Sequence, residues 1–176
     1  MAGTGAMMGA MFGAETGKLL DRAARTCDRN GSRLTDIRRH VLGLVLDSDR
    51  PVGAYDLLDR LRQSHKGAAP PTVYRALDFL QEQGLIHKVE RLSAFVGCVQ
   101  DDRGHDHAHH DHKVQFLICS VCQRTVEIDE PRIADALEAA AARHGFVPRR
   151  STIELEGLCA DCVAEADRAE QAREPG

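Results

Sequence analysis

Four of the six cysteines form two pairs with identical spacing. The pairs are Cys119 with Cys122 and Cys159 with Cys162, and a tight turn within each pair can direct two sulfurs at one ion. Zinc prefers a tetrahedral shell, which four thiolates fill completely without leaving an open position. We therefore expect a structural zinc site that ties the first strand pair of the C-terminal half to the end of the chain. The alternative, redox-active dithiols or cysteines without a common role, is less favoured because each pair borders a predicted strand.

A second group of possible metal ligands lies near the middle of the chain. It consists of His87, Cys98, Glu127 and five histidines between residues 105 and 112. Mixed nitrogen, sulfur and oxygen ligands suit zinc, and a thiolate disfavours magnesium and calcium. One ion held from both sides of this region would fix the angle between two domains, as in a metal-operated switch. The residues alone equally allow a solvated histidine tract that binds metal loosely, with His87 as a surface residue.

The segment PPTVYRALDFLQEQG carries polar and apolar residues on opposite sides of a predicted helix. Its polar side includes Thr72, Tyr74 and Arg75. Arginine can donate two hydrogen bonds to a guanine edge, and apolar ring atoms can meet a thymine methyl group. Tyr55, at the start of the preceding predicted helix, could reach the same DNA. The pattern suits a recognition helix, although any amphipathic helix can carry such residues.

Hydrophobic periodicity and turn residues predict the elements that position these groups. Helices are expected over 15–30, 37–48, 52–62 and from 72 to the stop at Gly84, followed by extended runs 85–90 and 94–98. This is the order of a winged helix. After a polar linker, strands are expected at 114–119 and 125–128, a helix at about 130–144, a strand over 146–157, and a short, fraying helix at the end. The fold class is therefore α+β.

The domain prediction follows from these elements. It comprises a flexible extension (1–14), a winged-helix DNA-binding domain (15–98), a histidine-rich hinge (99–112) and an α/β metal-binding domain (113–176).

Composition and charge set limits on these domains. Of the 176 residues, 43% are hydrophobic and 4% aromatic, so the core must be aliphatic and modest, and metal or dimerisation is expected to help hold it. Residues 1–90 contain 13 Lys/Arg and 11 Asp/Glu (net +2), and residues 91–176 contain 10 and 16 (net −6). The N-terminal half can therefore present a basic face despite the net charge of −4. No apolar run is long enough to span a bilayer and no signal peptide is recognisable, so we expect a cytoplasmic protein without a membrane partner.

Several segments match a known family over about residues 18–163. They are RLTDIRRHVL, AYDLLDRLR, PPTVYRALDFLQEQGLIHKVE, FLICSVCQRTVE, HGFVPRRSTIELEG and GLCADC. On these motifs the chain resembles the ferric uptake regulator (Fur) family, and within it the zinc uptake regulator (Zur) branch. The resemblance implies a homodimeric repressor that binds palindromic operators of zinc-uptake genes when loaded with zinc. It also implies that the winged-helix domain is joined by a hinge to an α/β dimerisation domain.

The resemblance assigns metal ligands by motif position. It implies about two zinc ions per chain: the structural ion at the four paired cysteines, and a regulatory ion at His87, Cys98, His112 and Glu127. The loop is richer in histidine than the family pattern. The extra histidines could compete with His112 or form a third zinc site; they are His105, His107, His109 and His110.

The resemblance also assigns contacts with DNA. Tyr55 and Arg75 match base-contacting positions, and Thr72 and Tyr74 lie beside them. Asp59 and Arg62 match positions that can bridge two neighbouring dimers on one operator.

Three other functions are open at this point. A sensor of the same fold could respond to iron, nickel or peroxide, although the Cys98 thiolate favours zinc. A zinc hydrolase or deaminase would need a catalytic glutamate beside an open zinc site, and because the deaminase signature is absent we expect no enzyme. A zinc buffer would use the histidine tract only to store metal.

Overall fold

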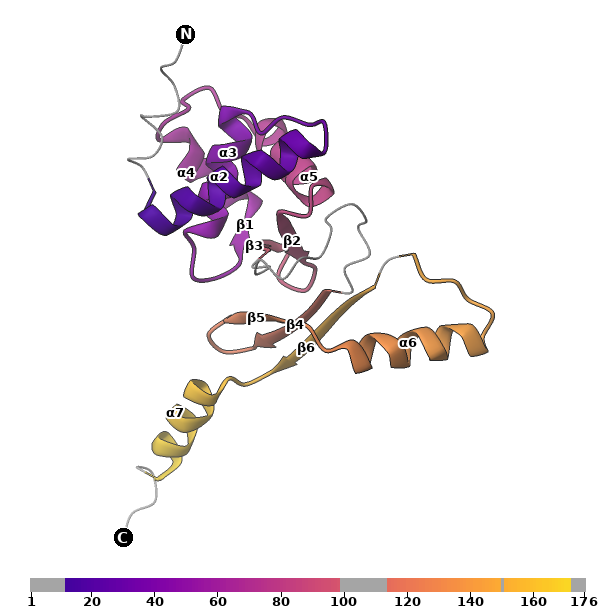
Figure 1. The fold of residues 1–176 in the computed structure, drawn as a ribbon. Helices are drawn as coiled ribbons and strands as arrows, with labels where there is room; N and C mark the ends of the chain where they lie inside the picture. The colour runs from indigo at the N-terminus through magenta and orange to yellow at the C-terminus, as the bar shows by residue number, and fades with distance from the viewer. Residues whose placement is uncertain (1–11, 99–113, 150, 172–176) are drawn as a thin grey trace. The chain divides into compact units, whose positions relative to one another are not determined.

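In the computed structural model the chain divides into two compact units, residues 1–110 and 111–176. The structure describes residues 12–98, 114–149 and 151–171 (Figure 1). None of the helices among these residues is long and apolar enough to cross a membrane.

The first unit combines four helices with a small antiparallel sheet (Figure 1). The helices are α2 (Ala14–Arg29), α3 (Asp36–Leu46), α4 (Ala54–Arg62) and α5 (Pro70–Glu82). The strands are β1 (Val52–Gly53), β2 (Ile86–Val89) and β3 (Ala94–Gly97), in the order β1-β3-β2. Helices followed by a β2–β3 hairpin make up the expected winged helix, so this part of the α+β prediction is confirmed.

The core of the first unit is mainly aliphatic, as its composition requires. In α5 the residues Val73, Ala76, Leu77 and Leu80 recur at helical spacing and are each at most 2% exposed. Burial of one large aliphatic side chain contributes about 1.5–3 kcal/mol, so this face holds α5 against its neighbours. The opposite face of α5 stays in solvent and is available for a ligand.

Both ends of α5 are set by local chemistry. Pro70 and Pro71 occupy its first two positions, where a backbone N–H has no partner within the helix in any case. At the other end Gly84 adopts a φ of 66°, and the N–H of Leu85 donates to the carbonyl of Leu80 at 2.9 Å. Such a left-handed residue ends a helix at little cost only when it is glycine. The wing therefore begins directly after the helix.

Two predicted helix starts in this unit were wrong. Val52 and Gly53 do not begin a helix but form β1, because they pair with Phe95 and Ala94 of the wing. The helix at 70–82 begins two residues before the expected Thr72, since proline is well tolerated in the first turn.

The second unit is a three-stranded sheet with two helices (Figure 1). Its elements are β4 (Val114–Cys119), β5 (Thr125–Ile128), α6 (Pro131–Arg143), β6 (Thr152–Gly157) and α7 (Ala160–Gln171). The sheet order is β5-β4-β6, with β4 antiparallel to β5 and parallel to β6. The register places Cys119 opposite Gly157, so β4 and β6 end at the same edge.

Two expectations for this unit were also wrong. The strand predicted over 146–157 covers only 152–157; Phe146 and Val147 are exposed, and Pro148 offers no N–H to a ladder. The terminal helix, expected to be short and to fray after Cys162, begins at Ala160 and runs for 12 residues.

The second unit buries little apolar surface. Among its described residues the buried apolar side chains are Phe116, Ile118, Cys119 and Ala134. Leu117 lies between Val126 on β5 and Leu155 on β6 in the registers of the two strand pairs. These three side chains are 40%, 47% and 63% exposed, so an apolar row crosses the sheet without a cover in the single chain.

Candidate functional site

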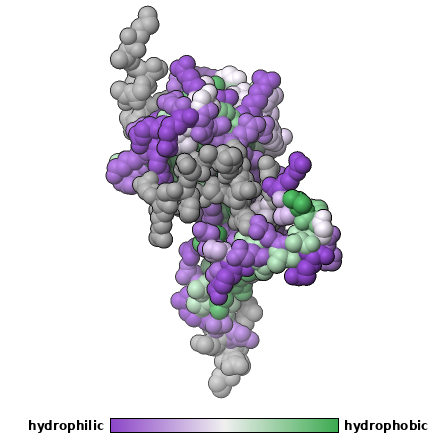
Figure 2. All heavy atoms as spheres, turned by 45° about the vertical axis from the view of Figure 1, so that its right-hand side comes forward, coloured by the Kyte–Doolittle hydropathy of each residue, from purple (hydrophilic) through white to green (hydrophobic). Residues whose placement is uncertain are grey.

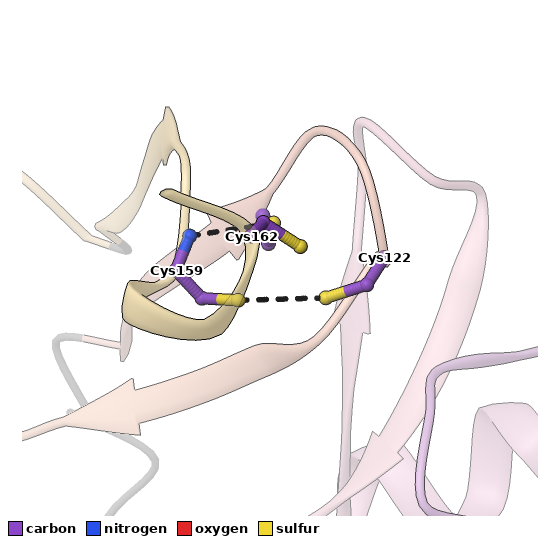
Figure 3. A group of neighbouring side chains, drawn as sticks. Cys122, Cys159 and Cys162 are labelled. Atoms are coloured by element: carbon purple, nitrogen blue, oxygen red, sulfur yellow. Dashed lines mark hydrogen bonds between the residues drawn. The ribbon is translucent and has the colours of Figure 1, made fainter. Parts of the chain in front are cut away.

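The four paired cysteines come together at the edge of the sheet where β4 and β6 end. Their four Sγ atoms all lie within 4.8 Å of one another; the residues are Cys119, Cys122, Cys159 and Cys162. The Sγ atoms of Cys122 and Cys159 are 3.7 Å apart, and Figure 3 shows them facing one another from the turn after β4 and from the segment leading into α7. The two cysteine pairs, far apart in the sequence, therefore form one compact cluster of four sulfurs.

The turn between Cys119 and Cys122 is closed by a strained residue. Gln123 has a φ of 59° and donates its N–H to the carbonyl of Cys119 at 2.9 Å. The N–H of Cys119 donates in return to the carbonyl of Arg124 at 2.9 Å. A left-handed conformation costs a residue other than glycine about 1–2 kcal/mol, so the surrounding contacts must hold this turn. The turn fixes where both sulfurs point.

Backbone donors favour the ionised form of one of these sulfurs. The N–H of Cys159 lies 3.4 Å from the Sγ of Cys119. Hydrogen bonds from the backbone of Cys122 and of Cys159 lower the pKa of the Cys119 thiol to about 6. Cys162 changes in the opposite direction: its hydrogen bond with Cys159, together with burial, raises its pKa to about 12. Four sulfurs this close cannot all ionise unless a cation supplies compensating charge.

A surface ion pair joins the two cysteine turns. The Nη1 of Arg124 lies 2.7 Å from the Oδ2 of Asp161, 37 residues away. Asp161, followed by the sulfur charges of Cys159 and Cys122, raises the pKa of the Arg124 guanidinium. A permanent cation therefore sits beside the sulfur cluster. Four sulfurs, backbone donors aimed at one of them and a neighbouring cation fit a zinc ion in a closed, structural shell.

The structure brings two ligands of the second predicted site together on the wing. His87 lies on β2 opposite Val96, and Cys98 follows β3 and donates its N–H to Leu85 at 3.0 Å. The same antiparallel register therefore continues, and it places His87 and Cys98 on one face of the hairpin. A ring nitrogen of His87 and the Sγ of Cys98 lie within 4.8 Å of each other. The wing can thus offer one nitrogen and one sulfur to the same ion.

The remaining predicted ligands belong to later segments of the sequence. Glu127 is on β5, in the second unit. His112 and the four additional loop histidines fall outside the described residues.

The predicted DNA-contacting residues cluster near the starts of α4 and α5. Tyr55, the second residue of α4, is 69% exposed, and Tyr74 is 45% exposed. Arg75 is exposed on the same solvent side of α5. Thr72 is half-buried, and its hydroxyl accepts a hydrogen bond from the N–H of Ala69 at 3.4 Å. Thr72 therefore caps α5, a contact that its predicted role did not include.

Asp59 and Arg62 contact one another within α4. The Nη1 of Arg62 lies 3.5 Å from the Oδ1 of Asp59, and its Nε donates to the carbonyl of Ala68 at 3.2 Å. Their spacing along the helix could have predicted the ion pair. The sequence carries no signal for the bond to Ala68, which depends on how the following loop folds back.

Comparisons with known proteins agree on one family. A model described as the ferric uptake regulator family matches residues 29–156. The chain is 42% identical over 148 residues to the zinc uptake regulation protein of Escherichia coli (strain K12), covering 84% of this chain and 83% of that protein. A solved structure of a zinc uptake regulator complexed with zinc and DNA shares 40% identity at a TM-score of 0.79, covering 88% of this chain and 99% of the other. The crystal structure of holo XcZur shares 44% identity at a TM-score of 0.73, covering 84% and 98%.

Proposed function

The chain belongs to the ferric uptake regulator family, and we propose that it is a zinc-responsive transcriptional repressor that binds operators of zinc-uptake genes when its regulatory site is loaded. The observation that carries this proposal is the juxtaposition of His87 and Cys98 on the wing, within 4.8 Å of each other. A metal ligand pair on the hairpin that follows the recognition helix couples metal binding to the element that reads DNA. The family comprises transcription regulators, so an enzymatic function has no support from it.

We assign two zinc ions per chain. The structural ion would be held by Cys119, Cys122, Cys159 and Cys162. The regulatory ion would be held by His87 and Cys98 together with Glu127 and His112. When bound there, zinc would supply one tetrahedral centre for ligands from both units. A third ion per chain at saturation would indicate a further site at His105, His107, His109 and His110.

The switch follows from differential binding. His87 and Cys98 would tie the wing, while Glu127 and His112 would tie the second unit, so that the angle between the units is fixed. In a homodimer, that angle determines whether both α5 helices can enter successive major-groove faces of a palindromic operator. Zinc would bind more tightly to the arrangement in which the angle suits DNA than to other arrangements. By linkage, this difference in zinc affinity sets how far zinc raises the affinity for DNA.

The apolar row of the second unit supports the homodimer. Leu117, Val126 and Leu155 are exposed side by side, and Ile133 and Leu137 of α6 are also exposed. Figure 2 shows hydrophobic side chains gathered on the surface of this unit. A unit with so few buried apolar residues gains stability when a second copy covers this row. Two such dimers could share one operator through Asp59 and Arg62. Because its target is DNA, we expect the protein to act in the cytoplasm.

The alternative is a sensor of the same fold for iron, nickel or peroxide. The observation that distinguishes it from the zinc sensor is the ligand set, because a thiolate at Cys98 selects a softer ion than an all nitrogen–oxygen site does.

The proposal is tested by operator gel shifts across buffered free zinc, with total metal measured per chain. We expect binding to appear at low free zinc and two ions per chain at saturation. Cys98→Ser should abolish the zinc dependence while leaving the structural ion bound. If Cys98→Ser leaves metal-dependent binding unchanged, the regulatory site is assigned wrongly. Binding that ignores zinc and responds to iron or peroxide would keep the family and refute the zinc function.

A further inference from the structure

The loop 63–69 joins α4 to α5 and determines where the recognition helix begins. Its first residues, 63–65, donate their N–H groups back to carbonyls of α4. Beyond them, the N–H of Ala68 donates to the carbonyl of His65 at 2.8 Å and that of Ala69 to the hydroxyl of Thr72 at 3.4 Å, whereas Pro70 and Pro71 have no N–H. A side chain at Gly67 would meet no other atom within 4 Å. Between His65 and the N-cap of α5, the path of the loop therefore depends on what holds Ala68.

Arg62 supplies such an anchor. Its Nε donates to the carbonyl of Ala68 at 3.2 Å, and Ala68 itself is 8% exposed. A hydrogen bond from a charged donor is stronger than one between neutral groups. Through this bond the last turn of α4 holds the residue that precedes the N-cap of α5, Ala69. The cap in turn aligns the first turn of the helix, which carries Thr72.

The same guanidinium also faces away from the loop. Its Nη1 lies 3.5 Å from Asp59, and the Arg62 side chain is 48% exposed. The planar guanidinium has five donors, so it can keep the bond to Ala68 with one edge while another edge meets a carboxylate. Among the described residues, Asp59 contacts Arg62 only at this second edge and does not touch Ala68. Loss of Arg62 should therefore release the loop, whereas loss of Asp59 should not.

We infer that Arg62 is a positioning residue for the recognition helix, holding the start of α5 in place through the carbonyl of Ala68. This rests on the proposed function and adds to the contact between dimers that the family resemblance implies for this position. A carboxylate of a neighbouring dimer that met the second edge of Arg62, beside Asp59, would restrict the same side chain that holds α5. Contact between dimers and the position of the recognition helix would then be coupled through one residue.

The experiment compares Arg62→Ala with Asp59→Ala on two operators, one that accepts a single dimer and one that accepts two. On the single-dimer operator no contact between dimers exists. There we expect Arg62→Ala to weaken binding by about five- to tenfold, less than the full effect of one lost charge-assisted hydrogen bond because the bond lies within the protein, and Asp59→Ala to change it less than twofold. On the two-dimer operator both variants should reduce cooperativity.

Two further measurements separate positioning from a direct phosphate contact. If Arg62 touched a phosphate, its loss would lower the salt dependence of binding by about one charge, and Arg62→Lys would restore affinity. We expect the salt dependence to stay unchanged and Arg62→Lys to restore little, because an ammonium lacks the two-edged fork. Amide hydrogen exchange in the DNA-free protein should speed up at 66–72 in Arg62→Ala and stay unchanged in Asp59→Ala. Zinc content should match wild type in both, and the melting temperature of Arg62→Ala should fall by no more than a few degrees.

The outcomes distinguish the inference from the proposed function. If both variants bind the single-dimer operator like wild type and show unchanged exchange at 66–72, Arg62 acts only between dimers and the inference is wrong. If wild type binds no operator at any zinc level, the proposed function fails, while the exchange experiment still reports whether Arg62 holds the loop.

Discussion

Arg124 and Asp161 join the two cysteine turns at a distance of 2.7 Å, although 37 residues separate them in the chain. Each partner belongs to one turn: Arg124 follows Cys122 by two residues, and Asp161 lies between Cys159 and Cys162. A zinc ion held by these four thiolates would form a site with a net charge of −2, and the guanidinium would lie beside it.

Arg124→Ala should therefore speed the release of the structural zinc. Both side chains are more than half exposed, so water and salt screen the pair and the expected effect is only a few-fold. Release to a chromogenic chelator, followed as a function of ionic strength, measures it. Asp161→Asn is the matched control, because it breaks the ion pair but leaves the cation beside the sulfurs. Slower release from Arg124→Ala than from wild type would contradict the charge argument.

Leu155→Asp should shift the protein from dimer to monomer. Leu155 is 63% exposed in the single chain, so the change should not unfold the unit, yet it places a charge in the apolar row that a second copy is proposed to cover. Loss of one buried leucine per subunit would weaken dimerisation by at least about tenfold. Sedimentation measures the shift. Thr152→Asp adds the same charge to β6 on the opposite face of the strand and should leave the dimer intact; equal effects would place the interface elsewhere.

Arg75→Ala should weaken operator binding and relax sequence preference at one base pair. A lost bidentate contact with a base costs about 1–3 kcal/mol, or roughly ten- to hundredfold. Binding to a set of operators with single base changes measures both effects. A uniform loss across all sequences would instead mean that Arg75 contacts phosphate.

The melting temperature should fall as pH drops below about 6.5, partly because of His40. This side chain is 2% exposed, and burial followed by the charge of His65 lowers its pKa from 6.5. The unfolded chain then binds a proton more readily than the folded one, so stability is full above the unfolded pKa and is lost as pH falls toward the folded value.

His40→Gln removes this titration and keeps a side chain that can bond to Ser64, whose Oγ lies 3.4 Å from the His40 Nδ1. Its melting temperature should decline less than that of wild type between pH 7.5 and 5.5, measured by calorimetry in saturating zinc. A steeper decline in the variant would show that His40 is not the group responsible.

Local sequence signals predicted the parts of the structure that depend on local chemistry. Gly84 ended α5 as expected, and the identical spacing of the two cysteine pairs anticipated their clustering. The two-residue strand at Val52 could not be predicted, since it exists only because Phe95 of the wing pairs with it. The bonds of Arg62 to Ala68 and of Arg124 to Asp161 escaped prediction for a similar reason: each forms only after a loop or a whole sheet has closed.

The pairing of Cys119 with Gly157 in the parallel ladder has a consequence for how the protein matures. The cysteine cluster closes only when β6 enters the sheet in this one alignment, because a slip by two residues would displace Cys159 by about 6.6 Å along the strand. Zinc binding by the newly made chain would therefore stabilise the molecules in which β6 is correctly aligned and would not stabilise misaligned ones.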